Sequence, residues 1–311
     1  MIRPLPPEFI STMSNLYGQR GTDWCTTIGM HLAKLAVQWD LSLGDAFPLS
    51  YNYVCTATIT KTQRAVVLKT APANPDFDTE VAMLQHYGGR SAVEIIAVDD
   101  HATALLIARA DPGIRLVDSG LHDDEQTGIA AQLMRASWYP KSSVLNLPTI
   151  VSQVGILSTL STDHPAAVAL LGSSHLLTAV RLCAQLQRPD VGVPLHGDLH
   201  HENILQHGSQ WLIIDPKGII GNPAAECAAF LRNPGRLLDS GIDVVALTIR
   251  RIDIFHQILG VPAAEIAGWN YVLMVLSAWW CYEEEHTIHR RVLGYIDAFA
   301  HVAAHYGVIA A

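Results

Sequence analysis

Two aspartates and an asparagine, close together in the chain, carry side chains suited to phosphoryl transfer. The segment His196-Gly-Asp-Leu-His-His-Glu-Asn-Ile-Leu205 places Asn203 five residues after Asp198, and Asp215 follows the strand-like run Trp211-Leu-Ile-Ile. A carboxylate can orient an acceptor hydroxyl and take its proton, so Asp198 is the candidate catalytic base. Asn203 and Asp215 offer the hard oxygen ligands that Mg²⁺ prefers when it bridges nucleotide phosphates. One such residue alone is as often a turn or cap, but the ordered set predicts a kinase.

A lysine and a glutamate further upstream form a second candidate group. Lys69 ends the strand-like run Arg64-Ala-Val-Val-Leu-Lys, and Glu80 lies in the predicted helix that follows. In kinase-like sites such a pair holds the α- and β-phosphates of the nucleotide. A strand lysine taken alone is usually a solvated edge residue. The prediction therefore depends on the glutamate and on the position of both residues upstream of Asp198.

Other nucleotide contacts have weaker signals. Residues 47–54 contain no glycine-rich loop, and the chain has no G-x-x-x-x-G-K-[ST] motif. Ser50 and Asn52 are the candidate phosphate contacts in that segment. Ala108 and Ala110, where a predicted strand runs into the connection between lobes, would offer main-chain groups to the adenine edge. An ordinary strand and turn explains these two alanines nearly as well.

Candidate acceptor contacts combine aromatic rings with carboxylates. They are Glu202 within the Asp198 segment and, near the C-terminus, Trp279, Trp280, Glu283 and Glu284. Such groups would bind a polyhydroxylated, cationic acceptor through cation–π contacts and charge-assisted hydrogen bonds. Core tryptophans beside a solvated acidic run explain the C-terminal group about as well.

Three histidines near Asp198 invite a metal-site interpretation: His196, His200 and His201. No cysteine or regular second cluster accompanies them, as a zinc site would require. We expect them to form hydrogen bonds that shape the loop.

The periodicity of apolar residues divides the chain into two lobes. The first has a helical stretch before about residue 40, a strand hairpin at 54–60 and 64–69, a helix at 76–87 and strands at 94–98 and 104–108. After the breaker Asp111-Pro-Gly113 the pattern is helical, and its only strand-like piece is Gln210 to Asp215, paired with residues 204–205. The prediction is an α+β, two-lobed fold: a small β-sheet nucleotide-binding lobe, residues 1–110, and a mostly helical catalytic and acceptor-binding lobe, residues 111–311.

Composition limits the partners of the chain. Its 311 residues are 50% hydrophobic and 16% charged, which suits a folded protein whose two lobes share a cleft. A net charge of −9 argues against nucleic acid, and the apolar run Trp269 to Tyr282 is shorter than the roughly 20 residues of a membrane span. Five dispersed cysteines and no signal peptide indicate a cytoplasmic protein. Nothing decides between monomer and homodimer.

The motifs together resemble the aminoglycoside phosphotransferases, in the streptomycin 6-kinase and hydroxyurea phosphotransferase branch. The resemblance rests on the segment from His196 to Leu205, on Trp211-Leu-Ile-Ile-Asp-Pro-Lys-Gly218, on the Lys69 strand, and on Gly221-Asn-Pro-Ala-Ala-Glu226 and Leu231-Arg-Asn-Pro234. It implies a protein-kinase-like fold, ATP or GTP with Mg²⁺, and phosphorylation of an alcohol on an antibiotic, in a family associated with antibiotic resistance. It also implies Asp198 as base, Asn203 and Asp215 as metal ligands, and Lys69 with Glu80 as phosphate clamp. The chain departs from the family in having Glu226 for an aspartate and Ala108 for a hinge glutamate.

Two other functions stay open. One is a metabolic kinase acting on choline, homoserine or a sugar, and the other is a non-catalytic nucleotide-binding protein. A wide acidic pocket near Asp198 would favour an aminoglycoside-like acceptor, and a small aromatic box would favour choline. A protein kinase is disfavoured because the chain lacks H-R-D, D-F-G and A-P-E motifs.

Overall fold

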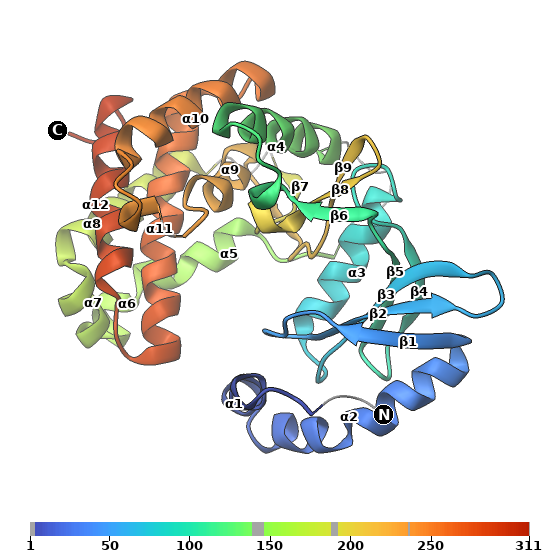
Figure 1. Ribbon diagram of the computed structural model, residues 1–311. Coiled ribbons are helices and arrows are strands. Elements are labelled where there is room, and N and C mark those ends of the chain that lie inside the picture. Colours follow the sequence, from blue (N-terminus) through green and yellow to red (C-terminus); the bar gives the residue numbers. More distant parts are fainter. Residues whose placement is uncertain (1–3, 139–145, 188–191, 236, 311) are drawn as a thin grey trace. The chain divides into compact units, whose positions relative to one another are not determined.

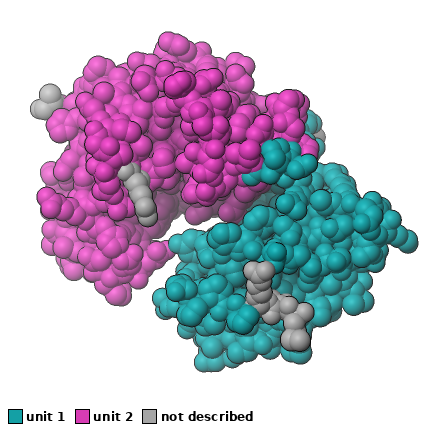
Figure 2. All heavy atoms as spheres, viewed as in Figure 1, with its two compact units in different colours: residues 1–113 teal, residues 114–311 magenta. Residues whose placement is uncertain are grey.

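The computed structural model describes residues 4–138, 146–187, 192–235 and 237–310 (Figure 1). Within it the chain forms two compact units, residues 1–113 and residues 114–311 (Figure 2). The division thus lies at Gly113, a little beyond the boundary expected at residue 110. A β-sheet unit followed by a mostly helical unit is the architecture that the sequence predicts.

The N-terminal unit is built on an antiparallel five-stranded sheet, in the order β1-β2-β3-β5-β4. Its elements are α1 (Pro7–Tyr17), α2 (Gln19–Gln38), β1 (Leu41–Ala46), β2 (Tyr53–Ile59), β3 (Arg64–Thr70), α3 (Pro75–Tyr87), β4 (Ile95–Asp99) and β5 (Ala104–Ala108). In β2 every second residue is buried from Tyr53 to Ala57, the pattern of a strand with one face on a core. The sequence analysis missed β1, because only Leu41 of that strand is buried and the alternation is weak.

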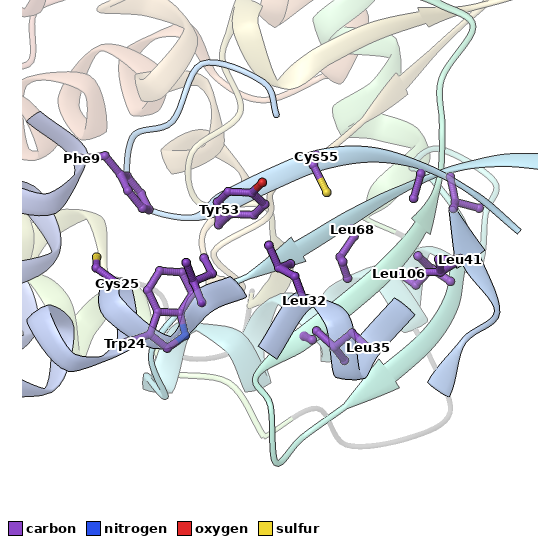
Figure 3. Close-up of a cluster of buried hydrophobic side chains, with 14 of the residues drawn as sticks. Phe9, Trp24, Cys25, Leu32, Leu35, Leu41, Tyr53, Cys55, Leu68 and Leu106 are labelled. Atoms are coloured by element: carbon purple, nitrogen blue, oxygen red, sulfur yellow. The ribbon is translucent and has the colours of Figure 1, made fainter. Parts of the chain in front are cut away.

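Helices α1 and α2 cover the core side of this sheet. Phe9, Trp24 and Leu32 of the helices form one buried cluster with Tyr53 and Leu68 of the strands (Figure 3). The two helices approach so closely at Gly21 that a Cβ atom there would lie 2.1 Å from the carbonyl oxygen of Met13. Any larger residue would push the helices apart.

Helix α3, which carries Glu80, has well-defined ends. The side chain of Asn74 accepts a hydrogen bond from the Phe77 amide at 3.1 Å, and Pro75 begins the helix. Gly88 ends it in the left-handed conformation, with φ of 57°. The sequence prediction of residues 76–87 is therefore accurate to within a residue.

The C-terminal unit is mostly helical and carries short strands. Its helices are α4 (Asp123–Ser137), α5 (Ile150–Val154), α6 (Leu160–Asp163), α7 (Pro165–Leu171), α8 (Ser173–Leu186), α9 (Pro223–Leu231), α10 (Val244–Leu259), α11 (Ala263–Glu285) and α12 (Arg290–His305). Its strands are β6 (Pro112–Arg115), which begins at the junction of the units, β7 (Val193–Leu195), β8 (Ile204–His207), β9 (Gln210–Ile213) and β10 (Ile219–Gly221). The predicted pairing of β8 with β9 is confirmed.

The prediction that Gln210 to Asp215 is the only strand-like piece of this unit, apart from its partner at residues 204–205, is wrong. Strands β6, β7 and β10 were not expected, because three or four residues are too few to show an alternating pattern. Gly172, whose φ is 91°, separates α7 from α8. Helix α10 begins at Val244, since Asp243 caps its N-terminus by accepting from the Ala246 amide.

An arginine in the interior ties three helices of this unit together. Arg251 of α10 is 1% exposed, and its Nε lies 3.1 Å from both carboxylate oxygens of Asp123 on α4. Its Nη1 donates to the carbonyl oxygens of Phe230 in α9 and of Asn233, at 3.2 and 2.7 Å. A buried guanidinium is tolerated when its donors are matched in this way.

Among the described residues, no single helix is long and apolar enough to cross a membrane; α7 and α8 reach that length and hydropathy only as a pair bent by 99°.

Candidate active site

The ring of His196 contacts both of the segments that carry the candidate base and the candidate metal ligands. His196 directly follows β7 in the chain, and its ring is fully buried. Its Nδ1 accepts a hydrogen bond from the Asp198 amide at 3.2 Å. Its Nε2 lies 2.9 Å from the carbonyl oxygen of Ile214, the residue before Asp215. Burial lowers the pKa of His196 to about 4, so the ring is neutral near pH 7 and these contacts fix one tautomer. The histidine thus shapes the loop by hydrogen bonding.

Glu226 holds the same loop from helix α9. Its carboxylate is 2% exposed, and its two oxygens accept the amides of His196 at 2.6 Å and Gly197 at 3.0 Å. Burial raises the pKa of Glu226 to about 7, although the two amide hydrogen bonds oppose that rise. Sequence reasoning noted this residue only as a family departure. A lone acid within the apolar helix Pro223–Leu231 is the signal that could have identified it.

Gly197 is required by the shape of the turn before Asp198. Its φ is 81°, and a Cβ atom would lie 2.7 Å from Cγ1 and 2.8 Å from Cδ1 of Ile219 in β10. A side chain here would therefore meet both backbone strain and a steric clash. The glycine allows the chain to turn sharply and to present the next residue.

Asp198 presents a partly exposed carboxylate. Its side chain is 26% exposed, and Oδ1 accepts from Nη2 of Arg232 at 3.2 Å. Its other oxygen, Oδ2, lies 4.0 Å from Nε2 of His200, beyond hydrogen-bonding distance. Arg232 caps the C-terminal end of α9, the helix that carries Glu226. One helix therefore positions the loop through a carboxylate and orients the candidate base through a guanidinium.

A main-chain hydrogen bond joins the segments that carry Asn203 and Asp215, and the side chains of these two residues suit a hard cation. The Asn203 side chain donates from Nδ2 to the carbonyl oxygen of Asp198 at 3.0 Å, which leaves Oδ1 as its ligand atom. Its own carbonyl accepts from the Ile214 amide at 3.0 Å. Asp215 follows with a left-handed φ of 61°, a conformation that aspartate tolerates better than most residues and that often marks functional positions. An amide oxygen and a carboxylate are the donor set that Mg²⁺ prefers.

The two other histidines also have structural contacts. His201 stacks on Phe230 with ring centroids 3.7 Å apart, and burial together with the Arg251 charge lowers its pKa to about 2. The Nδ1 atom of His200 accepts from the Glu202 amide at 3.3 Å, and burial lowers its pKa. Neutral histidines held in this way fit the loop-shaping role expected from the sequence.

Lys69 and Glu80 meet within the N-terminal unit. The Nζ atom of Lys69 lies 2.7 Å from Oε1 and 2.8 Å from Oε2 of Glu80, and the two side chains are 12% and 10% exposed. Lys69 comes from β3 and Glu80 from α3, so the predicted pair forms. Its role in binding phosphate remains a prediction.

The structure gives less support to the other residues that were predicted to contact the nucleotide. Ser50 is exposed and Asn52 half-buried, both in the connection between β1 and β2. The Ala108 amide donates to the carbonyl oxygen of Glu94 at 2.8 Å. Its N–H group is thus already used and cannot also donate to a base. Ala110 is buried directly after β5.

A pocket in the C-terminal unit adjoins Asp198. It is partly open to solvent, and Gly197, Arg232 and Trp280 are among its lining residues. Its walls come from α5, β7, β10, α9 and α11. Arg232 therefore both lines this pocket and contacts the candidate base.

Of the residues predicted to contact the acceptor, one lines this pocket and the others do not. Trp280 lines it, whereas Trp279 is 7% exposed and packs on His164 with ring centroids 4.4 Å apart. Glu283 and Glu284 are exposed on the last turn of α11 and are not among the lining residues. Glu202 is also exposed, and its Oε1 accepts from Nη1 of Arg115 at 2.9 Å. The structure brings only the tryptophan at position 280 to the pocket.

Comparison with known proteins shows which family the chain resembles. The family model described as aminoglycoside/hydroxyurea antibiotic resistance kinase matches residues 53–285. Streptomycin 6-kinase of Streptomyces glaucescens is 24% identical over 288 residues, which cover 90% of this chain and 91% of that protein. Helices α1 and α2 precede the segment that the family model matches.

Solved structures share the fold. A thermostable mutant of aminoglycoside phosphotransferase APH(4)-Ia, in a ternary complex with ADP and hygromycin B, has a TM-score of 0.61 at 14% identity and covers 88% of this chain and 98% of its own. Choline kinase LicA from Streptococcus pneumoniae has a TM-score of 0.60 at 13% identity, covering 90% and 100% of the two chains. The chain therefore belongs to the aminoglycoside/hydroxyurea antibiotic resistance kinases, phosphotransferases with a protein-kinase-like fold.

Proposed function

We propose that the protein transfers the γ-phosphoryl group of ATP or GTP to an alcohol group of a small molecule, an aminoglycoside-like antibiotic or a related secondary metabolite. The observation that carries the proposal is the Asp198 turn. Glu226 and His196 hold it by main-chain hydrogen bonds, and it presents a carboxylate that is 26% exposed. A base that is fixed at its backbone yet open at its side chain suits proton transfer.

Asp198 would act on the acceptor hydroxyl. As the hydroxyl oxygen forms a bond to the γ-phosphorus, the O–H proton passes to the Asp198 carboxylate. The bond between the γ-phosphorus and the bridging oxygen breaks, and the nucleoside diphosphate leaves with that electron pair. Arg232, at 3.2 Å from Oδ1, would keep the carboxylate oriented during this step.

The remaining roles concern the nucleotide. Asn203, through Oδ1, and Asp215 would hold Mg²⁺, which when bound neutralises charge on the phosphate oxygens. The Lys69 ammonium, fixed by both oxygens of Glu80, would pair with the α- and β-phosphates. Ser50 and Asn52 would add phosphate contacts, and the main chain of Ala110 would contact the base.

A metabolic kinase is the second candidate. Its support is the likeness in fold to a choline kinase and the exposed ring of Trp280 in the pocket, since aromatic faces bind quaternary amines. A panel containing streptomycin, hydroxyurea, choline, homoserine and simple sugars, followed by coupled detection of the nucleoside diphosphate, separates the candidates.

The base assignment is tested with Asp198→Asn, which keeps the size of the side chain. We expect acceptor-dependent turnover to fall by about 10²- to 10⁴-fold, the usual contribution of a general base, while Mg²⁺–ATP binding measured by calorimetry persists. Asp239→Asn is the matched control, because that exposed carboxylate pairs with Arg291 at 3.1 Å. Turnover that survives in Asp198→Asn would contradict the proposal. Failure of the wild type to bind nucleotide would favour a non-catalytic role.

A further inference from the structure

A cysteine, a glutamate and a histidine meet where α11 ends and α12 begins. Cys281 and Glu285 lie four residues apart on α11, and His289 is the residue before α12. The thiol, the carboxylate and the imidazole each offer one ligand atom, and these three atoms all lie within 4.8 Å of one another. The Nε2 atom of His289 lies 2.8 Å from Oε2 of Glu285.

We propose that Cys281, Glu285 and His289 bind Zn²⁺ at the surface of the C-terminal unit, with water completing the coordination. The bound ion links the last turn of α11 to the start of α12. The site is separate from the proposed phosphoryl-transfer site and does not depend on it, because the two have different ligands.

The turn between the helices explains why the three side chains converge. Residues four apart on a helix share a face, which brings Cys281 and Glu285 together. His286 ends α11 in the left-handed conformation, with φ of 54°, and its amide donates to a carbonyl oxygen one turn earlier at 2.8 Å. Ile288 is 7% exposed and anchors the turn in the interior. The chain therefore reverses within residues 286–289, and α12 returns beside α11 with His289 at its start (Figure 1).

The separations of the ligand atoms suit a tetrahedral ion. Bonds from Zn²⁺ to nitrogen, oxygen and sulfur, set at tetrahedral angles, place ligand atoms roughly 3.3–3.7 Å apart. The 2.8 Å between the imidazole nitrogen and the carboxylate oxygen is slightly shorter, and the other separations are at most 4.8 Å. The side chains of His289 and Glu285 are 54% and 50% exposed, so they can reach the required distances by rotamer changes that leave the core in place.

The types of ligand favour a zinc-like metal over Mg²⁺. A thiolate and an imidazole bind borderline metals such as Zn²⁺ and Co²⁺, whereas Mg²⁺ prefers oxygen ligands. The adjoining sequence adds the exposed acids Glu283 and Glu284 and the exposed base Arg290. The guanidinium of Arg291 is already paired with Asp239 at 3.1 Å. Acidic groups thus dominate the surroundings of the site, which favours a cation.

The thiol of this group is accessible to an ion from solvent. Of the five cysteines, Cys25, Cys55, Cys183 and Cys227 are buried, and Cys281 is half-buried. Metal binding replaces the thiol proton, which passes to the solvent, so that sulfur binds as a thiolate. An exposed imidazole and carboxylate beside an accessible thiol allow the ion to enter without opening the fold.

Cobalt spectroscopy tests the site directly. The full-length protein is treated with a chelator and a phosphine reductant, freed of chelator, and titrated with Co²⁺ in excess Mg²⁺. We expect a near-ultraviolet thiolate-to-cobalt charge-transfer band that saturates at about one ion per chain and that Zn²⁺ removes by competition. Absence of this band in excess Mg²⁺ would overturn the proposal.

Substitution of each ligand identifies the site. Cys281→Ser should remove the charge-transfer band. Glu285→Gln and His289→Gln should each weaken Co²⁺ binding by at least about tenfold, since even the loss of an outer-shell partner commonly costs about 10- to 100-fold. His286→Asn and Glu284→Gln are the matched controls, because both residues are exposed neighbours outside the cluster, and they should leave the affinity unchanged. A band that persists in Cys281→Ser, or equal losses in the controls, would overturn the proposal.

Thermal unfolding tests whether the ion links the two helices. Zn²⁺ should raise the Tm of the wild type, because a ligand that binds the folded state stabilises it, and should not raise the Tm of Cys281→Ser. His289→Gln, at an exposed position, serves as the second variant if Cys281→Ser does not fold. An equal rise in the wild type and the folded variant would contradict the assigned ligands.

The base variant separates this site from the proposed function. Asp198→Asn should bind Co²⁺ as the wild type does, whatever its turnover. Phosphoryl transfer by a wild type that shows no thiolate-to-cobalt band would support the function and reject the zinc site. A normal band in a wild type that transfers no phosphate would support the zinc site and reject the function.

Discussion

An ion pair holds the candidate phosphate-binding lysine of the N-terminal unit, and another holds the candidate base of the C-terminal unit; the two pairs differ in their contacts and exposure. In the N-terminal unit, Nζ of Lys69 contacts both oxygens of Glu80, and the two side chains are about one-tenth exposed. In the C-terminal unit, Arg232 contacts one oxygen of Asp198 at 3.2 Å, and the side chains are 21% and 26% exposed. We call the first pair closed, because the lysine contacts both carboxylate oxygens and both side chains are nearly buried. We call the second pair open, because the arginine contacts only one carboxylate oxygen and both side chains are more exposed.

The difference follows from what each pair is proposed to do. A lysine that binds phosphates needs a fixed position and a counter-charge while it is shielded from water, which two short contacts provide. A base needs a free oxygen directed at the hydroxyl, and Oδ2 of Asp198 has no hydrogen-bonding contact with His200 at 4.0 Å. The geometry of an ion pair therefore indicates whether a charge is held as a fixed binding group or kept available for reaction.

Opening the closed pair should strongly weaken the use of nucleotide. In Lys69→Met we expect kcat/KM for ATP to fall by about 10- to 150-fold, corresponding to a lost hydrogen bond between charged groups worth about 1.5–3 kcal/mol. Steady-state kinetics with varied ATP measure this. Arg64→Met is the control from the same strand, since Arg64 pairs with Glu94 at 2.6 Å but the side chains are 45% and 56% exposed. Equal losses in the two variants would contradict the distinction between closed and exposed pairs.

Weakening the hydrogen bonds by which Glu226 holds the Asp198 turn should lower the free energy of unfolding. In Glu226→Gln the amide places an N–H donor against one of the two main-chain donors, so we expect a loss of about 1–3 kcal/mol in unfolding free energy by urea titration. Glu226→Asp keeps the charge and should lose less if the shorter side chain still reaches one amide. A Gln variant as stable as the wild type would show that the clamp does not stabilise the loop.

The histidine that supports this region should make stability depend on pH. The folded-state pKa of His201 is about 2, below its ordinary value of 6.5, so below pH 6.5 the unfolded chain binds a proton that the folded protein excludes. Stability should therefore fall as pH decreases from 6.5, by up to about 1.4 kcal/mol per pH unit from this residue. His201→Phe, which keeps a ring against Phe230, should reduce that slope in urea titrations at pH 7, 6 and 5. An unchanged slope would contradict the assigned shift.

A conservative change in the open pair should have the smallest effect. Arg232→Lys keeps a positive charge near Oδ1 of Asp198, and a single contact does not need the forked guanidinium. We expect kcat to fall by less than about tenfold, with a larger fall in Arg232→Met, and nucleotide KM unchanged in both. A change in nucleotide KM rather than kcat would show that Arg232 acts on the nucleotide instead of orienting the base.

Sequence reasoning succeeded where a short run of residues carries its own signal. Local periodicity predicted β3 and α3, as their observed bounds confirm. The roles of Asp198, Asn203 and Asp215, inferred from their order and spacing, stay predictions. It failed for β7 and β10, whose three residues are too few for a pattern and form strands only because they pair with each other. It also missed Glu226, since no local pattern shows which distant amides a buried carboxylate will meet.

The sequence by itself determined the reaction class, because phosphoryl transfer needs particular side chains in a set order and the family carries them in one segment. Only the tertiary structure decided which side chains line the pocket beside the Asp198 turn. Trp279 and Trp280 are neighbours in the chain, yet one is buried against His164 and the other lines the pocket, because successive residues of a helix point in different directions. The same geometry left Glu283 and Glu284 in solvent and brought Arg232 to Asp198 across more than thirty residues.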